Sequence, residues 1–414
     1  MINENKNKLI VFLLSIATTG YSMNLTQPYD PFVQQERTKG YRLQFSVLGQ
    51  GSFSSAKGYD EDGCRVNVLR IWNSDQNALK MLDGFDSDTK IGQMRVRVGA
   101  NDDGVRGHFT VCGDYKKHGV SFSGRWRFHE DFSIVAHVPV WHDSLKNVLW
   151  SEQTKDLTAD DIRTKQYLTD NFFDNVCTFG DDLWLQDWSR TGFGDISVLL
   201  EWLRDFKQTK EYLKNVRANA RGGFVIPTGK KQDEDKLFAL PFGTDGGLGL
   251  LFGAGLDVTL GTYMQAGFNV TLQHIFSNTR CRRIKTHEDQ TELLLLAKTE
   301  VYKDFAVSQM FNLFIKGQNF IDRFSCLAGY QFFRRGDESL AILQNIYSEI
   351  IANSAKSLEE ITMHNLFFSL NYDVYDEDEE RSWYPHIQAF VKIPFNGHFS
   401  AQCNSAGIVF AFDF

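Results

Sequence analysis

Most of the chain alternates between apolar and polar residues with the period of two that extended strands show. From Val120 to Phe128, apolar or small residues hold the even positions and polar residues the odd ones. Successive side chains of a strand point to opposite faces, so each such run predicts a strand with one apolar face. Similar runs predict strands at 41–49, 105–113, 132–140, 195–202, 217–224, 248–260, 264–272, 305–315, 320–332, 366–374, 383–393 and 406–414.

The predicted strands are long, and aromatic residues lie at the ends of their apolar faces. Strands of soluble sheets usually have about 5–6 residues, whereas a strand that crosses a bilayer needs roughly 9–11 tilted residues. Aromatic side chains gather where a membrane meets water, and here they are Trp126, Phe128, Phe276, Tyr372 and Trp383. The pattern predicts an all-β fold, a transmembrane antiparallel β-barrel of about 14 strands (12–16). A soluble β-sandwich is the alternative.

The last residues of the chain also favour a membrane barrel. From 406 to 414 every second residue is small or apolar, and the sequence closes on Phe414. This strand resembles the C-terminal aromatic strand that the assembly machinery of Gram-negative outer membranes reads. Phe410, Phe412 and Phe414 are therefore the predicted assembly signal. The predicted partners are this machinery and outer-membrane lipid.

The first residues have the pattern of a secretory signal peptide. Two lysines precede a short apolar run, and small residues follow it. The apolar run is too short for a spanning helix, which needs about 20 residues. We therefore expect an exported protein with a signal peptide at 1–22, a periplasmic lead-in at 23–40 and a single transmembrane β-barrel at 41–414.

Two stretches have helical periodicity instead. Thr158 and Asp161 have the spacing of a capping box at the start of the stretch 158–176. Apolar residues recur at helical intervals over 338–358. Both stretches predict short loop helices, which either plug the lumen or cap the rim of the barrel.

Two further strand predictions fall near the N-terminal side of the barrel. One is at 64–71. The other, at 94–100, alternates apolar residues with two arginines and is followed by an Asn-Asp-Asp-Gly sequence. Such a sequence between two alternating runs is a hairpin signal, so we expect 94–100 to pair with 105–113.

Composition and motifs exclude several classes of function. The net charge is −8 and no basic patch dominates, which argues against a nucleic-acid partner. The six cysteines include no CxxC pair and the ten histidines no ligand spacing, so neither a metal nor a cofactor is predicted. One disulfide bridge stays an open possibility. His142 and Ser144 share a strand face, as in an outer-membrane phospholipase, but the Asn-Gly of that enzyme's motif is missing. An enzyme is therefore not predicted.

The stretch 191–260 resembles a known family. It contains TGFGD at 191–195, a strand that ends in PTG at 227–229, and a returning glycine-rich strand at 248–260. These features resemble outer-membrane channels associated with aromatic meta-cleavage pathways, which are distant relatives of the long-chain fatty-acid transporters. The resemblance implies an outer-membrane barrel that passes small solutes of apolar or aromatic character. The Asn-Pro-Ala hatch motif of the fatty-acid transporters is missing.

Charged and amide residues on the polar faces are the candidate lumen lining. An arginine or lysine facing lipid costs about 2–4 kcal/mol at the bilayer midplane, which favours an inward orientation. There they set the field that solutes meet, or brace the wall through ion pairs. The predicted lumen residues are Arg125, Arg127, Asp195, Glu201, Arg217, Arg221, Asp257, Asn269, Gln273 and Lys392.

Three hypotheses of function follow. The first is a porin-like channel for passive passage of small solutes, which are not identified by the sequence. The second is a structural or surface-exposed barrel whose lumen is filled by 338–358 or by the loop at 140–191. The third is an outer-membrane lipid hydrolase that uses Ser144, and it would require loss of activity in Ser144→Ala.

Overall fold

The computed structural model describes residues 21–22, 26–35, 41–99, 101–321, 323–344, 346–374 and 382–414. Residues 1–20 of the predicted signal peptide lie outside this part of the chain, as do 23–25 and 36–40 of the predicted lead-in. No helix within the described ranges is long and apolar enough to cross a bilayer.

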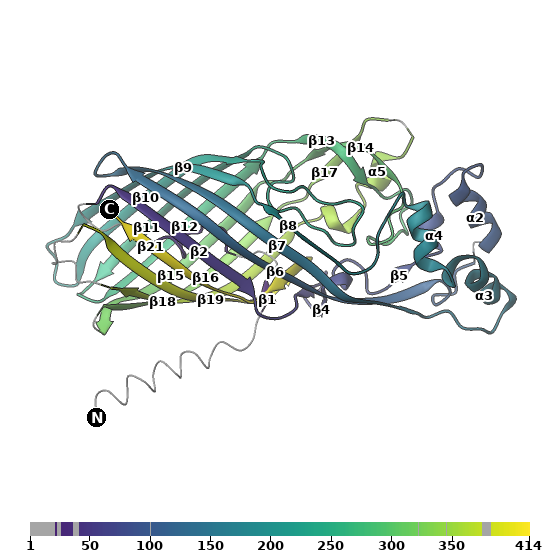
Figure 1. Ribbon diagram of the computed structural model, residues 1–414, viewed down its shortest axis with the longest axis horizontal. Helices are drawn as coiled ribbons and strands as arrows, with labels where there is room; N and C mark the ends of the chain where they lie inside the picture. Colours follow the sequence, from purple (N-terminus) through teal and green to yellow (C-terminus); the bar gives the residue numbers. More distant parts are fainter. Residues whose placement is uncertain are drawn as a thin grey trace, which may run out of the picture.

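Antiparallel strands close into one long barrel (Figure 1). Among the described residues, one sheet contains 14 strands, of which 12 form the closed wall because β6 pairs with both β2 and β7. The predicted all-β barrel is thus confirmed. In spatial order the wall strands are β2 (Leu43–Ser52), β21 (Ser405–Asp413), β19 (Tyr384–His398), β18 (Ile361–Asp373), β16 (Phe324–Arg335), β15 (Ser308–Ile321), β12 (Met264–Ile275), β11 (Gly249–Leu260), β10 (Leu213–Ile226), β9 (Ile196–Lys207), β7 (Phe132–Glu152) and β6 (His108–Arg127).

The two ends of the barrel differ. At one end, which we call the turn end, short connections such as 261–263 join the strands, and Phe414 pairs with Leu43. The long connections gather at the opposite, loop end (Figure 1). Outer-membrane barrels have short periplasmic turns and longer extracellular loops. By this rule, we expect the loop end to face outward.

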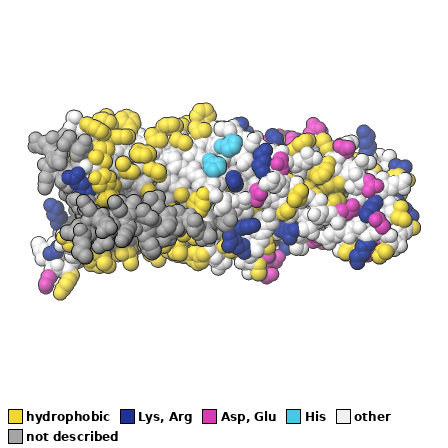
Figure 2. Space-filling view, turned by 60° about the horizontal axis from the view of Figure 1, so that its bottom comes forward, with side chains coloured by type: hydrophobic (Ala, Val, Ile, Leu, Met, Phe, Trp, Pro, Cys, Tyr) yellow, Lys and Arg dark blue, Asp and Glu magenta, His cyan; other side chains and the backbone are white. Residues whose placement is uncertain are grey.

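The outer wall carries an apolar belt next to the turn end. Figure 2 shows hydrophobic side chains gathered over this half, and charged ones over the loop-end half. The predicted aromatic residues Trp126, Phe128, Phe276 and Trp383 are exposed on it. Further exposed members of the belt are Phe45, Phe122, Leu200, Phe252, Leu256, Phe268, Leu272, Leu313, Ile315, Phe368, Ile408 and Phe410. Such a belt is stable only against hydrocarbon.

Above the belt, the loops fold into a canopy with its own core. It contains Phe109, Val111 and Tyr115, which are buried on the face of β6 that carries Arg125 lower down. The inner face of β6 is therefore polar within the belt and apolar beyond it. Beyond the membrane, water surrounds the strand, so apolar side chains turn inward as in a soluble protein.

The canopy combines small sheets and short helices. Beside β6 and β7 lie β5 (Gln76–Asn77) and β8 (Trp188–Phe193). One small sheet consists of β13 (Asn278–Arg283), β14 (Lys298–Asp304) and β17 (Ser339–Ile342), and a second one of β1 (Tyr21–Ser22), β20 (Ser400–Cys403), β3 (Lys57–Tyr59) and β4 (Arg65–Asn67). The helices are α2 (Lys90–Val98), α3 (Ala159–Thr164), α4 (Phe172–Phe179) and α5 (Glu349–Ala352). The short helical turns are η1 (Val68–Arg70), η2 (Lys80–Leu82), η3 (Lys165–Thr169) and η4 (Lys356–Leu358).

The strand prediction at 94–100 is wrong. Residues 94–98 belong to helix α2, which Thr89 caps by accepting a hydrogen bond from the Gly92 N–H, and residue 100 lies outside the described residues. The helix ends at Gly99, whose φ of +83° suits glycine. The partner expected for this hairpin, 105–113, instead contributes to β6 and pairs with β7. Alternation over one short window fits either element, and packing against the canopy selects the helix.

The two helical stretches had different outcomes. The capping box of Thr158 and Asp161 is confirmed, although the helix divides into α3, η3 and α4. The predicted helix at 338–358 is wrong, because β17 takes its first part and α5 is a single short turn. The strand predicted at 64–71 is reduced to β4, followed by η1.

We predict that Leu313→Arg destabilises the barrel by about 2–4 kcal/mol, the cost of a lipid-facing arginine near the midplane. Leu313 is 56% exposed in the middle of β15. The check is urea unfolding of the folded protein in lipid vesicles. Leu343→Arg is the matched control, since Leu343 is 54% exposed but lies in the canopy. Equal losses in both variants would contradict the membrane placement of the belt.

Candidate functional site

The N-terminal segment 26–35 lies inside the barrel, and we call it the plug segment. Inward-facing side chains of the wall bind its backbone. Gln50 Nε2 donates to the Thr26 carbonyl at 2.6 Å, Gln388 Nε2 donates to the Phe32 carbonyl at 2.8 Å, and Arg221 donates to the Tyr29 carbonyl. The sequence analysis assigned these residues to a lead-in ahead of the barrel, whereas they occupy the lumen.

Phe32 is the apolar anchor of the plug segment. Its ring is 2% exposed and stacks on Phe367, with centroids 4.8 Å apart. It meets Phe314 edge-on at 6.2 Å. A Cβ at Gly329 would approach the Phe32 ring to 2.6 Å, so the ring fits against the wall because residue 329 has no side chain. Tight packing of this kind makes the seat specific for the ring.

Asp30 provides a polar anchor two residues before Phe32. Its carboxylate accepts hydrogen bonds from Gln331 Nε2 at 2.6 Å and from the Phe32 N–H at 3.1 Å. Gln331 also donates to Asn312 Oδ1 at 3.0 Å, so the anchor belongs to an amide network on β15 and β16. The plug segment is thus held by side chains, without a covalent bond.

The plug segment divides the lumen into two cavities. On the turn-end side is a vestibule of about 1120 Å³, which Phe32, Gln34 and Gln35 border. On the loop-end side is an inner chamber of about 410 Å³, which Gln27, Tyr29 and Asp30 border beneath the canopy. Each cavity has room for water and small molecules, and ten residues of chain lie between them.

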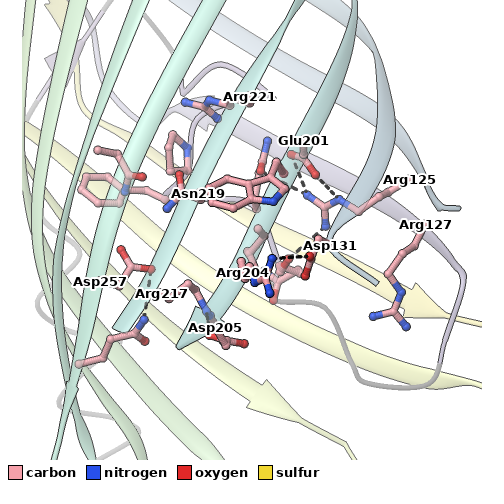
Figure 3. A pocket seen from close by; sticks show the side chains of 18 of the residues that line it. Arg125, Arg127, Asp131, Glu201, Arg204, Asp205, Arg217, Asn219, Arg221 and Asp257 are labelled. Carbon is pink, nitrogen blue, oxygen red and sulfur yellow. Dashed lines mark hydrogen bonds and ion pairs between the residues drawn. The ribbon is translucent and has the colours of Figure 1, made fainter. Parts of the chain in front are cut away.

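The vestibule is lined by charges arranged in pairs (Figure 3). Arg125 Nε lies 2.9 Å from Glu201 Oε2, and both side chains are more than nine-tenths buried. Arg125 Nη1 also donates to the Gln35 carbonyl at 3.2 Å, which ties the pair to the plug segment. Nearer the turn end, Arg217 Nε lies 2.8 Å from Asp205 Oδ1. The wall therefore presents alternating charges rather than one sign.

The predicted lumen residues occupy both cavities. Arg125, Arg127, Glu201, Arg217, Arg221, Asp257 and Asn269 border the vestibule. Asp195, Gln273 and Lys392 border the inner chamber. Their roles toward a solute remain predictions. The sequence analysis missed the plug segment; the signal available was Tyr29 and Phe32, each directly after a proline, within a polar stretch.

Asp195 of the TGFGD sequence acts within the wall. Its carboxylate accepts hydrogen bonds from the Gly229 N–H at 2.8 Å and from Thr244 Oγ1 at 2.7 Å. Thr228 Oγ1 donates to the Gly194 carbonyl at 3.0 Å. The family-like TGFGD and PTG sequences thus hold the β10–β11 loop against the junction of β8 and β9. These hydrogen bonds stabilise the loop and its turns.

The His142–Ser144 sequence lies on β7 above the belt. His142 is exposed and its Nδ1 lies 2.7 Å from Thr191 Oγ1 on β8. Asp143 points to the other side, where it is buried and accepts a hydrogen bond from Tyr115 Oη at 2.6 Å. These contacts serve strand pairing and the canopy core.

All six cysteines carry free thiols.

Comparisons with known proteins agree with the fold. No protein family and no curated protein matches the sequence. Among solved structures, the COG4313 outer membrane channel from Pseudomonas putida F1 superposes with a TM-score of 0.50 at 10% identity, over 94% of this chain and 100% of that one. A Pseudomonas aeruginosa FadL homologue matches with a TM-score of 0.30 at 10% identity, over 95% and 99% of the two chains. The Pseudomonas putida toluene transporter TodX matches with a TM-score of 0.29 at 7% identity, over 96% and 95%.

The closed wall, the apolar belt and the first of these similarities lead to the same conclusion. A barrel of this kind has no edge strands and satisfies its backbone hydrogen bonds within hydrocarbon. The superposed Pseudomonas putida structure is an outer membrane channel. The protein is an outer-membrane β-barrel that shares its fold with the Pseudomonas putida channel.

Proposed function

We propose that the protein is an outer-membrane channel for small solutes and that the plug segment closes its lumen at rest. The observation that carries this proposal is the division of the lumen into two cavities by ten residues of chain. Within the described part of the chain, this segment separates a solute in one cavity from the other cavity. Among the described residues, wall side chains hold the segment through hydrogen bonds, so it can leave its seat without unfolding the wall.

The inner chamber favours solutes with an apolar or aromatic body. Its volume, about 410 Å³, falls in the range of roughly 300–1,000 Å³ that small-molecule sites occupy. The aromatic residues that border it are Tyr29, Trp72, Trp141, Phe238, Phe242, Phe305, Phe333 and Phe399. Rings around a cavity of this size select flat, apolar molecules by shape and dispersion. Toluene transport by a structural neighbour is consistent with this class of solute.

The test is conductance of the purified, folded chain in planar lipid bilayers. We expect discrete current steps that alternate with long closed periods, because the plug segment must move before ions pass. The competing function is a structural barrel whose lumen stays filled, and the anchored plug segment favours it. That function predicts no steps, either for the native chain or for Phe32→Ala. Silence of both proteins would overturn the channel proposal.

Export and assembly complete the proposal. We infer that 1–22 directs export and that Phe410, Phe412 and Phe414 on β21 form the assembly signal. Phe410 and Phe414 are exposed on the lipid side, where an assembly factor can reach them. The outer-membrane fold requires both steps.

A further inference from the structure

A cluster of three ionic side chains borders the inner chamber under the canopy. Lys303 Nζ lies 2.7 Å from Glu338 Oε2, and Arg335 Nη1 lies 3.4 Å from the same oxygen. Lys303 is on β14, Arg335 closes β16, and Glu338 precedes β17, so three elements bring them together. Two cations therefore share one carboxylate, and the cluster has an excess of positive charge.

A third cation, Arg282, faces the same site. Its side chain is 6% exposed, one terminal nitrogen binds Asp245, and Nη2 donates to Asn278 Oδ1 at 2.9 Å. Its buried Nε has no hydrogen-bond partner in the described part of the chain. The guanidinium carbon of Arg282 lies 5.9 Å, and Lys303 Nζ 5.0 Å, from the ring centroid of Phe305. The aromatic ring thus lies within reach of two cations.

The excess charge is costly where it stands. The Lys303 side chain is 13% exposed and the Glu338 side chain 3%. Burial lowers the pKa of the Lys303 ammonium, and the nearby Arg335 and Arg282 lower it further, against the opposing effect of Glu338. Arg282 has the carboxylates of Asp245 and Glu234 beside it. Lys303 and Arg335 share the single carboxylate of Glu338, so an added anion would balance their remaining charge.

The walls beside the cluster are apolar. Phe305, Phe333, Leu340 and Ala352 border the same chamber as Lys303 and Arg335. A bound anion would therefore meet cations at one end and hydrocarbon along its body. Inorganic anions such as phosphate or sulfate would leave this apolar surface uncovered, whereas an organic carboxylate would cover it.

We propose that the inner chamber binds a small monocarboxylate with an apolar body. Its carboxylate accepts hydrogen bonds from Lys303, Arg335 and the Nε of Arg282, and its body packs against Phe305 and Leu340. This inference deepens the proposed function by naming the solute class of the same lumen. Glu338 occupies part of the cationic site and limits its affinity.

The test is isothermal titration of benzoate into the purified full chain in detergent micelles, with benzamide as the uncharged probe of equal shape. We expect saturable benzoate binding and at least about tenfold weaker benzamide binding, since a charge-assisted hydrogen bond is lost. Lys303→Met should weaken benzoate by about tenfold or more. The matched control, Lys298→Met, removes a β14 cation that binds Asp235 outside the chamber, and should leave benzoate binding unchanged.

Glu338→Gln provides a test in the opposite direction. The amide keeps an acceptor for Lys303 but removes the competing charge, so benzoate should bind more tightly. Equal binding of benzoate and benzamide, or unaltered benzoate affinity in both Lys303→Met and Glu338→Gln, would overturn the site. Benzoate binding by a protein that never conducts would disprove the channel and keep the site. Conductance without benzoate binding would support the channel and disprove the benzoate site.

Discussion

Phe32→Ala is expected to raise the open probability of the channel by roughly 100-fold or more. Truncating a buried phenylalanine costs about 3–5 kcal/mol, and each 1.4 kcal/mol is a factor of about ten in an equilibrium. Phe32 is 2% exposed between Phe367 and Phe314, so the loss falls on the seated plug segment. The wall strands keep their pairing. The measurement is single-channel recording in planar bilayers.

Phe45→Ala is the control for this prediction. Phe45 lies on β2 and is 55% exposed on the lipid side, so its truncation removes the same atoms without touching the lumen. It should leave the open probability unchanged. An equal change in both variants, or none in Phe32→Ala, would mean that the ring of Phe32 does not close the pore.

Glu201→Ala is expected to destabilise the folded barrel by about 3–5 kcal/mol, because removing one partner leaves a buried charge without its counter-charge. Arg125 and Glu201 are both more than nine-tenths buried and 2.9 Å apart. Glu201 also accepts a hydrogen bond from Ser133 Oγ at 3.2 Å. The measurement is the free energy of unfolding in urea, in lipid vesicles.

Asp205→Ala is the matched control for Glu201→Ala. Asp205 pairs with Arg217 in the same vestibule, but the two side chains are 34% and 23% exposed. An ion pair in contact with water contributes about 0–1 kcal/mol, so this loss should be small. A loss equal to that of Glu201→Ala would show that burial does not separate the two pairs. Because Arg125 also binds Gln35, Glu201→Ala should loosen the plug segment as well.

The two sites changed by Phe32→Ala and Glu201→Ala hold the plug segment in different ways. The seat of Phe32 is an apolar socket, whereas the Arg125–Glu201 pair forms part of the wall and reaches the segment through one carbonyl. Phe32→Ala should open the channel and leave the barrel stable. Glu201→Ala should lower the stability of the barrel itself. Recording and unfolding, applied to both variants, therefore separate gating from stability.

The sequence by itself determined the membrane barrel and most of its wall. The alternation at 120–140 and 248–272 reappears as β6, β7, β11 and β12. It is a local signal, because lipid on one side and a wet lumen on the other impose a period of two on each strand. The capping box of Thr158 and Asp161 is equally local, since its two side chains satisfy backbone groups within one turn.

Only the tertiary structure decided that the plug segment fills the lumen and that the canopy covers its loop end. The plug segment has no periodicity, and its contacts join Asp30 to Gln331 and Phe32 to Gln388, about 300 or more residues away in sequence. Likewise, 94–98 is helical and 339–342 is a strand, because packing within the canopy outweighs the local pattern there. Periodicity tells which face of an element meets which solvent. Which distant segment completes a cavity depends on shape and hydrogen-bond partners that exist only once the wall has closed.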